Sequence, residues 1–377
     1  MRVSVVLAVT GATLAVAIAG CQPAPAAAPA QQAAPAQQAA APTQAPAPAQ
    51  AAAPTAPPAA KPVPTQTTGA LQVPQPAAAG GAAGGKTYGD MTFCYPQLGA
   101  ESDWRTANTA SMKETAQKVG VKQLIFSDAQ QKQENQISAM RTCIQQGVDV
   151  IGLPPVVEDG WEPVLNEAKN ARIPVIIVDR SVSADASLYA THIGSDMVLE
   201  GQRAAKEMNK LLPNGGAVLE LSGTTGSGAA VGRAEGFRKD LGQNVKIIDS
   251  QTGNFTRAEA KPVMEAFLKK YKPGTDFQAL FIHNDDMGIG AIEALKAAGV
   301  KPGDVKIISV DGTRGGFQAM VDGWFQADVE CNPLLGPQVY DAALKLLNGQ
   351  SVEHNIITNE TVYYPDKAAE LLPTRQY

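Results

Sequence analysis

The chain has 377 residues, with 31 Lys and Arg against 36 Asp and Glu, a net charge of −5 and a hydrophobic content of 44%. This length suits two domains of ordinary size. The acidic balance, with no run of basic residues, argues against a nucleic-acid partner.

The amino-terminal quarter is unlike the rest of the chain. Residues 1–21, "MRVSVVLAVTGATLAVAIAGC", combine one basic residue, a short apolar run and a final cysteine, which predicts an export signal. The ending "AIAGC" resembles the lipobox of bacterial lipoproteins, so we expect Cys21 to be the lipidated first residue of the mature protein. The alternative is an ordinary cleavage site before Cys21. Residues 22–85 are almost wholly Ala, Pro, Gln, Gly and Thr, which predicts a disordered, semi-extended tether.

From residue 91 onward, short β-rich runs alternate with segments of helical spacing, which predicts parallel sheets covered by helices. About ten parallel strands exceed what one twisted sheet usually holds, so we expect an α/β fold of two doubly wound lobes. The expected strands are 91–95, 123–128, 148–153, 174–179, 188–193, 217–223, 245–250, 278–283, 305–310, 325–329 and 355–364.

The alternation breaks near "THIGSD", where two expected strands follow each other without a helix between them. We therefore place the lobe boundary there and expect the last two strands to cross back between the lobes. The predicted lobes are 86–191 plus 330–358 and 192–329 plus 359–377.

Three expected strands end in polar or charged residues. In open parallel sheets, ligands bind beyond the carboxyl ends of the strands. The ends "VIIVDRS", "LFIHNDD" and "IISVDGT" therefore predict a binding site that contains Asp179, Arg180, Asn284 and Asp311.

Two glycine-rich segments are candidate ligand-binding loops, and they differ in their position relative to the expected strands. "GGAAGGKT", residues 80–87, formally fits a phosphate-binding loop, but it precedes a strand instead of following one, which argues against nucleotide binding. "LSGTTGSGAAVGR", residues 221–233, follows a strand and leads into a helix. An anion site at that helix is one interpretation; a tight turn that lets a ligand approach, with Arg233 projecting into the cleft, is favoured.

A helix is expected to begin at "ESDWR", with Ser102 or Asp103 as its cap and Trp104 and Arg105 in its first turn. Trp104 is either a core residue or a flat surface for stacking on a sugar ring, and its position favours neither.

The remaining reactive side chains favour binding over catalysis. The three cysteines beyond the tether, Cys94, Cys143 and Cys331, are expected to be small core residues. The three histidines lack metal-ligand spacing, so we expect neither a metal site nor a cofactor. Each carboxylate near the predicted site has an arginine within reach, which favours a ligand-holding role over acid-base catalysis, so we expect no enzyme activity. This near-neutral set of donors and acceptors suits a neutral polyol.

Taken together, the chain resembles the sugar-binding proteins of bacterial ABC importers, within the ribose- and galactose-binding type of periplasmic binding proteins and closest to the galactofuranose-binding branch. The resemblance covers about residues 91–364. It rests on "ESDWRTANTASMKE", "SDAQQKQENQI", "QGVDVIGLPPVVEDGWEPVLNEAK", "IPVIIVDRS", "FTRAEAKPVMEAF", "HNDDMGIGAIEALKAAG" and "VDGWFQADVECNPLLGP".

The resemblance implies two lobes joined by three crossovers that close on a monosaccharide and deliver it to a permease. It implies that the first lobe contacts the sugar through Glu101, Ser102, Asp103, Trp104, Arg105, Asp179 and Arg180, and the second through Arg233, Asn284 and Asp311. Phe255 and the turn around Thr225 are weaker assignments.

We therefore predict an exported, lipid-anchored and monomeric solute-binding protein whose partners are a monosaccharide, the permease and the ATPase. The alternative is a sugar sensor that signals to a chemoreceptor or kinase. A repressor with this fold is disfavoured because it needs an amino-terminal helix-turn-helix.

Overall fold

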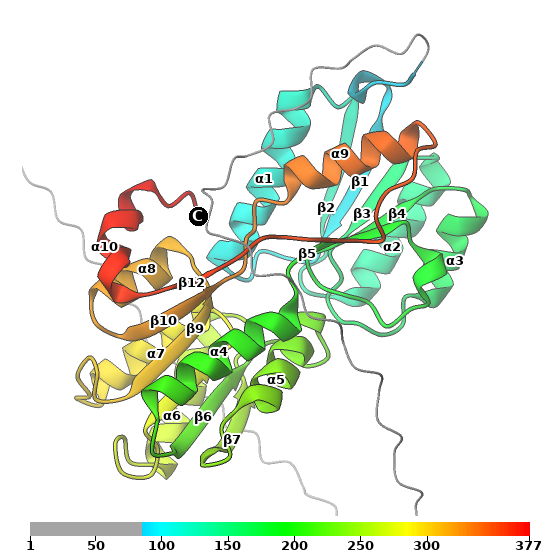
Figure 1. The fold of residues 1–377 in the computed structure, drawn as a ribbon. Helices are drawn as coiled ribbons and strands as arrows, with labels where there is room; N and C mark the ends of the chain where they lie inside the picture. The colour runs from blue at the N-terminus through cyan, green and yellow to red at the C-terminus, as the bar shows by residue number, and fades with distance from the viewer. Residues whose placement is uncertain (1–84) are drawn as a thin grey trace, which may run out of the picture. The chain divides into compact units, whose positions relative to one another are not determined.

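The computed structural model describes residues 85–377 as two six-stranded sheets. The predicted signal, Cys21 and nearly all of the predicted tether lie outside the described residues. The first sheet has the order β11-β5-β4-β3-β1-β2 and the second β12-β10-β9-β8-β6-β7. Every pairing between these strands is parallel except that of β12 with β10. The predicted α/β fold of two doubly wound lobes is confirmed (Figure 1).

We call the first sheet and its helices the first lobe, and the second sheet and its helices the second lobe. The strands of the first lobe are β1 (Thr92–Gln97), β2 (Gln123–Asp128), β3 (Val150–Leu153), β4 (Val175–Val178), β5 (Thr191–Gly194) and β11 (Asn355–Ile357). Its helices are α1 (Asp103–Val119), α2 (Gln133–Gln146), α3 (Glu162–Asn170) and α9 (Gly336–Leu347).

The second lobe repeats this plan. Its strands are β6 (Gly216–Ser222), β7 (Val245–Thr252), β8 (Ala279–Ile282), β9 (Lys306–Asp311), β10 (Phe325–Glu330) and β12 (Val362–Tyr363). Its helices are α4 (Met197–Leu211), α5 (Gly228–Asp240), α6 (Arg257–Lys270), α7 (Asp285–Ala297), α8 (Arg314–Val321) and α10 (Pro365–Leu371).

The sequence of each strand reflects its place in the sheet. The central strands β4, "VIIV", and β8, "ALFI", are buried at every position because helices cover both faces. The edge strands β2 and β7 are only partly buried, and β7 alternates inward and outward residues over much of its length. Continuous apolar runs therefore identify the interior of each sheet.

Three connections join the lobes, as the resemblance implies (Figure 1). They are residues 195–196 between β5 and α4, residues 331–335 between β10 and α9, and residues 358–361 between β11 and β12. The predicted boundary between residues 191 and 192 cuts β5, and the one before residue 330 cuts β10. By sheet topology, the lobe boundaries lie in the three connections. That each lobe is a separate domain stays a prediction.

The expectation that the three cysteines are core residues is confirmed, because each is at most 2% exposed and belongs to an apolar cluster. Cys94 in β1 and Cys143 in α2 form a disulfide that closes a sequence separation of 49 residues. Cys331 is a buried free thiol. An odd number of cysteines excludes complete pairing but leaves room for one pair, and only the fold shows which two side chains meet.

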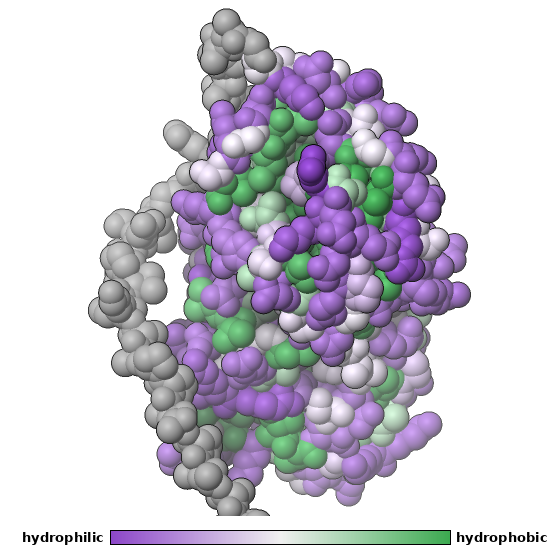
Figure 2. All heavy atoms as spheres, turned by 90° about the vertical axis from the view of Figure 1, so that its right-hand side faces the viewer, coloured by the Kyte–Doolittle hydropathy of each residue, from purple (hydrophilic) through white to green (hydrophobic). Residues whose placement is uncertain are grey.

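The described part of the chain holds no helix with the length and apolar character that crossing a membrane requires. Hydrophilic side chains cover most of the face shown in Figure 2, with smaller apolar areas between them.

A charged cavity between the two lobes

A small cavity lies where the carboxyl ends of both sheets meet, and it encloses about 270 Å³, part of it open to solvent. Both lobes line it, as expected for doubly wound sheets whose strand ends face each other. Its lining residues are Glu101, Ser102, Trp104, Arg105, Asp179, Arg180, Ala229, Arg233, Phe255, Asn284, Asp311 and Cys331.

In the first lobe, two arginines and two carboxylates form one buried network. Arg105 donates to Asp179 at 2.6 Å and to Glu101 at 3.1 Å, and Arg180 donates to the same Glu101 oxygen at 3.2 Å. The side chains of all four residues are at most 5% exposed. The network is neutral by formal charge, which makes its burial tolerable.

In the second lobe, Arg233 of α5 is held from three directions. Its Nε donates to Glu200 at 2.7 Å, its Nη1 donates to the His283 carbonyl, and its Nη2 lies 3.5 Å from Asp311. These contacts fix the direction of the guanidinium fork before any ligand enters.

Two cavity-lining side chains have buried atoms with no hydrogen-bond partner: Glu101 Oε2 and Arg105 Nη1. A buried charged group that lacks a partner costs about 1–3 kcal/mol or more. One acceptor and one donor therefore remain for a ligand, and neighbouring hydroxyls of a polyol can satisfy both.

Burial shifts the pKa values of three cavity-lining groups, Asp311, Arg180 and the Cys331 thiol, whose pKa is raised well above its ordinary range. Burial raises the pKa of Asp311 well above its ordinary range, although Arg233 opposes the shift. Burial, followed by repulsion from Arg105, lowers the pKa of Arg180 to about 10. Arg180 thus stays charged at neutral pH, while Asp311 is biased toward the neutral form that donates a hydrogen bond.

Three lining residues adopt positive φ angles: Asp179 at 65°, Phe255 at 63° and Asp311 at 131°. Such backbone strain in residues other than glycine clusters at ligand sites. The Phe255 ring packs over Gly223, where a Cβ would lie 1.9 Å from the ring, so this position requires glycine. Arg180 of the opposite lobe places its guanidinium carbon 4.8 Å from the ring centroid of Phe255.

The structure brings nine of the ten predicted sugar-contacting residues to this one cavity, and their binding role stays a proposal. The exception is Asp103, whose side chain is 61% exposed and pairs with Arg257 of the second lobe. Trp104 and Arg105 are buried and line the cavity, whereas Asp103, at the first position of α1, lies on the exposed side of the helix. Thr225, the weaker assignment, is also exposed.

Trp104 and Ser102 each have a structural role in addition to lining the cavity. Trp104 is buried, and its Nε1 donates to the Cys331 carbonyl at 2.7 Å. Ser102 is the helix cap, and its Oγ accepts from the Arg105 amide at 3.1 Å. Trp104 is thus a buried residue that also lines the cavity, and the Arg105 guanidinium carbon lies 4.6 Å from the centroid of its ring.

Sequence reasoning missed Ala229 and Cys331 and ranked Phe255 low. Ala229 carries no chemical signal. Cys331 follows β10 and Phe255 follows β7, so the strand-end rule that found Asn284 applies to both. That rule was applied only to polar residues, so Cys331 was not selected and Phe255 was assigned only weakly, from the resemblance.

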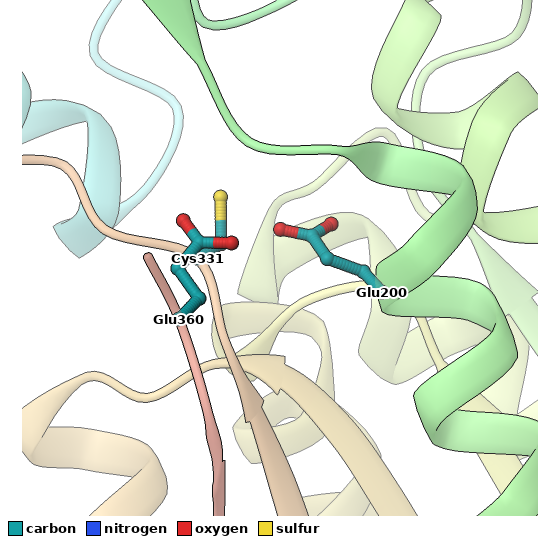
Figure 3. A group of neighbouring side chains, drawn as sticks. All are labelled: Glu200, Cys331 and Glu360. Atoms are coloured by element: carbon teal, nitrogen blue, oxygen red, sulfur yellow. The ribbon is translucent and has the colours of Figure 1, made fainter. Parts of the chain in front are cut away.

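Behind the cavity, Glu200 of α4 points toward Cys331 and Glu360 on two of the connections (Figure 3). One ligand atom from each of the three lies within 4.8 Å of the others, and Glu200 Oε1 has no partner. Glu200 Oε2 is already taken by Arg233.

Glu360 joins all three connections between the lobes. One of its oxygens, Oε1, accepts from Ser195 Oγ at 2.5 Å, the Asn332 amide at 2.9 Å and Thr358 Oγ1 at 2.7 Å. Burial, and then the nearby charge of Glu200, raises the pKa of Glu360 to about 8. Because protonation and these donors already satisfy the carboxyl, a cation is not needed to explain the cluster.

Two doubly wound lobes, three connections and an enclosed polar cavity define a two-lobed solute-binding protein. The family model described as periplasmic binding protein domain matches residues 96–351, and the chain belongs to this family. It is a homologue of proteins that are named as galactofuranose-binding proteins.

Three relatives are informative. The galactofuranose-binding protein YtfQ of Escherichia coli K12 is 44% identical over 295 residues, which span 76% of this chain and 92% of that protein. The binding protein of the arabinose ABC transporter of Shewanella sp. ANA-3, solved with α- and β-L-arabinofuranose, is 45% identical with a TM-score of 0.72, covering 76% of this chain and 95% of that one. A Mycobacterium smegmatis protein solved with β-D-fucofuranose is 48% identical with a TM-score of 0.73 and the same coverage, 76% and 95%.

Proposed function

We propose that this protein is a lipid-anchored solute-binding component of an ABC importer that captures a monosaccharide in furanose form and delivers it to a permease. The observation that carries the proposal is the pair of unpartnered buried atoms, Glu101 Oε2 and Arg105 Nη1, in a cavity lined by both lobes. The name of the Escherichia coli relative and the sugars bound to the other two support furanoses, with galactofuranose-like sugars as the first candidates.

The proposed mechanism is capture by closure. A sugar that contacts the first-lobe network and the second-lobe Arg233 binds the closed form better than the open form. That difference in affinity shifts the population toward the closed form, which the permease recognises. Glu101, Ser102, Trp104, Arg105, Asp179, Arg180, Arg233, Asn284 and Asp311 are the proposed contacts.

Calorimetry and thermal shift on the full chain test the binding step against a panel of furanoses, pyranoses and polyols. We expect one monosaccharide to raise the melting temperature, and Arg233→Ala and Asp179→Ala each to abolish the rise. Lys239→Ala is the matched control: it removes an exposed cation from the same helix and does not line the cavity. If no sugar binds, or if binding survives both substitutions, the site assignment is wrong.

Transport and anchoring need separate measurements. Deleting the protein is expected to abolish uptake of the labelled sugar, and Cys21→Ser is expected to move the protein from the membrane fraction to the soluble fraction. Normal uptake by the deletion strain, together with loss of a sugar-dependent response, would instead support the sensor alternative.

A further inference from the structure

Outside the cavity, three charged residues link the lobes in a closed ring. Arg257 at the start of α6 donates through Nη2 to the Asp103 carboxylate and through Nε to Asp286 Oδ1 at 2.7 Å. The backbone amide of Asp103 donates to Asp286 Oδ2 at 2.9 Å. Asp103 belongs to the first lobe and the other two belong to the second, so the ring spans both. We call these three residues the clasp.

The clasp is separate from the ligand cavity. None of its three residues lines the cavity. The side chains of Arg257 and Asp103 are 42% and 61% exposed, and that of Asp286 is 6% exposed. The clasp therefore affects closure without touching the proposed ligand.

Arg257 is the essential member for an electrostatic reason. Closure brings the carboxylates of Asp103 and Asp286 together, and burial, followed by the charge of Asp103, raises the pKa of Asp286 to about 6. Arg257 binds both carboxylates and turns this repulsion into attraction. Its pair with Asp286 lies within one lobe and survives opening, so the interactions that form only on closure are those of Asp103.

We propose that the clasp sets the fraction of ligand-free protein that is closed, and that Arg257 and Asp103 are positioning residues for sugar capture. The affinity part of this inference rests on the proposed function, since the apparent affinity of a ligand equals its affinity for the closed form multiplied by the fraction of protein that is closed. Exposed ion pairs are individually weak, so we expect loss of the clasp to weaken sugar binding by about threefold to tenfold.

The test compares Asp103→Asn, Arg257→Gln and the double variant in the full chain carrying Cys21→Ser. Spin labels at exposed Lys169 in α3 and Lys269 in α6, both replaced by cysteine, report the distance between the lobes. We expect Arg257→Gln to open the ligand-free protein most, because two carboxylates then face each other. Adding Asp103→Asn is expected to restore part of the closed fraction.

The affinity readout uses whichever of D-galactose, D-fucose and L-arabinose binds most tightly. For each clasp variant, the loss of affinity is expected to match its loss of closed fraction, because the clasp does not touch the proposed ligand. Arg141→Gln is the matched control: Arg141 is 47% exposed and pairs with Glu167 at 2.8 Å inside the first lobe. It is expected to change neither the distance nor the affinity.

Three results would overturn the inference: an unchanged distance distribution in Arg257→Gln, additive effects in the double variant, or an equal effect of Arg141→Gln. A failure of the proposed function would be distinguishable, because the label distances in the ligand-free protein do not depend on any sugar.

Discussion

The two lobes share one strand order but hold their arginines differently. In the first lobe, Arg105 and Arg180 bind carboxylates that themselves line the cavity, and both use the same oxygen of Glu101. In the second lobe, Arg233 is anchored by Glu200, which lies behind the cavity wall. The carboxylates that hold the first-lobe arginines therefore line the cavity, whereas the carboxylate that anchors Arg233 lies outside its lining.

This difference indicates what each lobe contributes to binding. The unpartnered buried atoms that line the cavity belong to the first lobe, at Glu101 and Arg105. The second lobe offers a guanidinium whose direction is already fixed. We infer that the ligand supplies the missing hydrogen-bond partners of the first lobe and is oriented by Arg233 of the second lobe. The same kind of substitution should therefore have different effects in the two lobes.

The largest expected effect lies where the lobes join, at Glu360. Its folded pKa of about 8 lies above the ordinary value of 4.5, so the folded state binds the proton more tightly than the unfolded state does. The stabilisation is complete below about pH 4.5 and is lost as the pH rises through about 8. From the size of the shift, the loss is on the order of 5 kcal/mol.

Urea denaturation of the protein and of Glu360→Gln at pH 5 and pH 9 measures this loss. Glutamine is neutral and keeps an oxygen for Ser195 and Asn332. We expect the variant to gain on the parent protein as the pH rises, and to be the more stable of the two at pH 9. If the difference in unfolding free energy between the variant and the parent protein did not change with pH, Glu360 would be charged in the folded state. The three connections between the lobes would then meet at a charged carboxylate.

Some of the residues that distinguish the two lobes could be predicted from the sequence. Asp179 and Asn284 follow apolar runs, so the rule for parallel strands placed each of them at the carboxyl end of its sheet without any coordinates. Glu200 and Glu360 were inaccessible for a physical reason. Glu200 sits inside a helix whose acidic and basic neighbours look like a solvated face, and Glu360 sits in a polar connection, so only packing shows that both are buried.

The second prediction isolates the anchor behind the second lobe. Glu200→Leu removes the Nε partner of Arg233 and leaves a buried guanidinium with Asp311 and a carbonyl only. Removing one partner of a buried ion pair typically lowers stability by about 3–5 kcal/mol. Because Arg233 keeps its other contacts, we expect a loss of about 3 kcal/mol. Thermal unfolding gives the stability loss, and calorimetry gives the accompanying loss of sugar affinity.

The control for this variant is Glu207→Leu on the same helix. Glu207 is largely buried, but its partner Lys210 is 67% exposed, so the ammonium left behind stays in water. The control variant is expected to change unfolding by less than about 1 kcal/mol. If Glu200→Leu were as mild as Glu207→Leu, the anchor would not distinguish the lobes, and Arg233 would be held by the cavity residues alone.

The smallest expected effect compares the two helix caps that line the cavity, one from each lobe. Ser102 Oγ accepts from the Arg105 amide and Asn284 Oδ1 accepts from the Met287 amide. Replacing either cap by alanine is expected to cost about 1 kcal/mol of stability. Exposed Asp196, the cap of α4, is the control because it lies outside the cavity.

Affinity should separate the two caps although stability does not. Asn284 also donates through Nδ2 to the Phe255 carbonyl at 3.2 Å, which holds a residue at positive φ against the cavity. Asn284→Ala releases that residue, and Asn284→Asp keeps the cap but loses the same donor, so both should weaken sugar binding more than Ser102→Ala does. Equal affinities for Asn284→Asp and the parent protein would mean that the orientation of the second lobe does not depend on Phe255. The difference between the two lobes would then depend only on Arg233 and its partner Glu200.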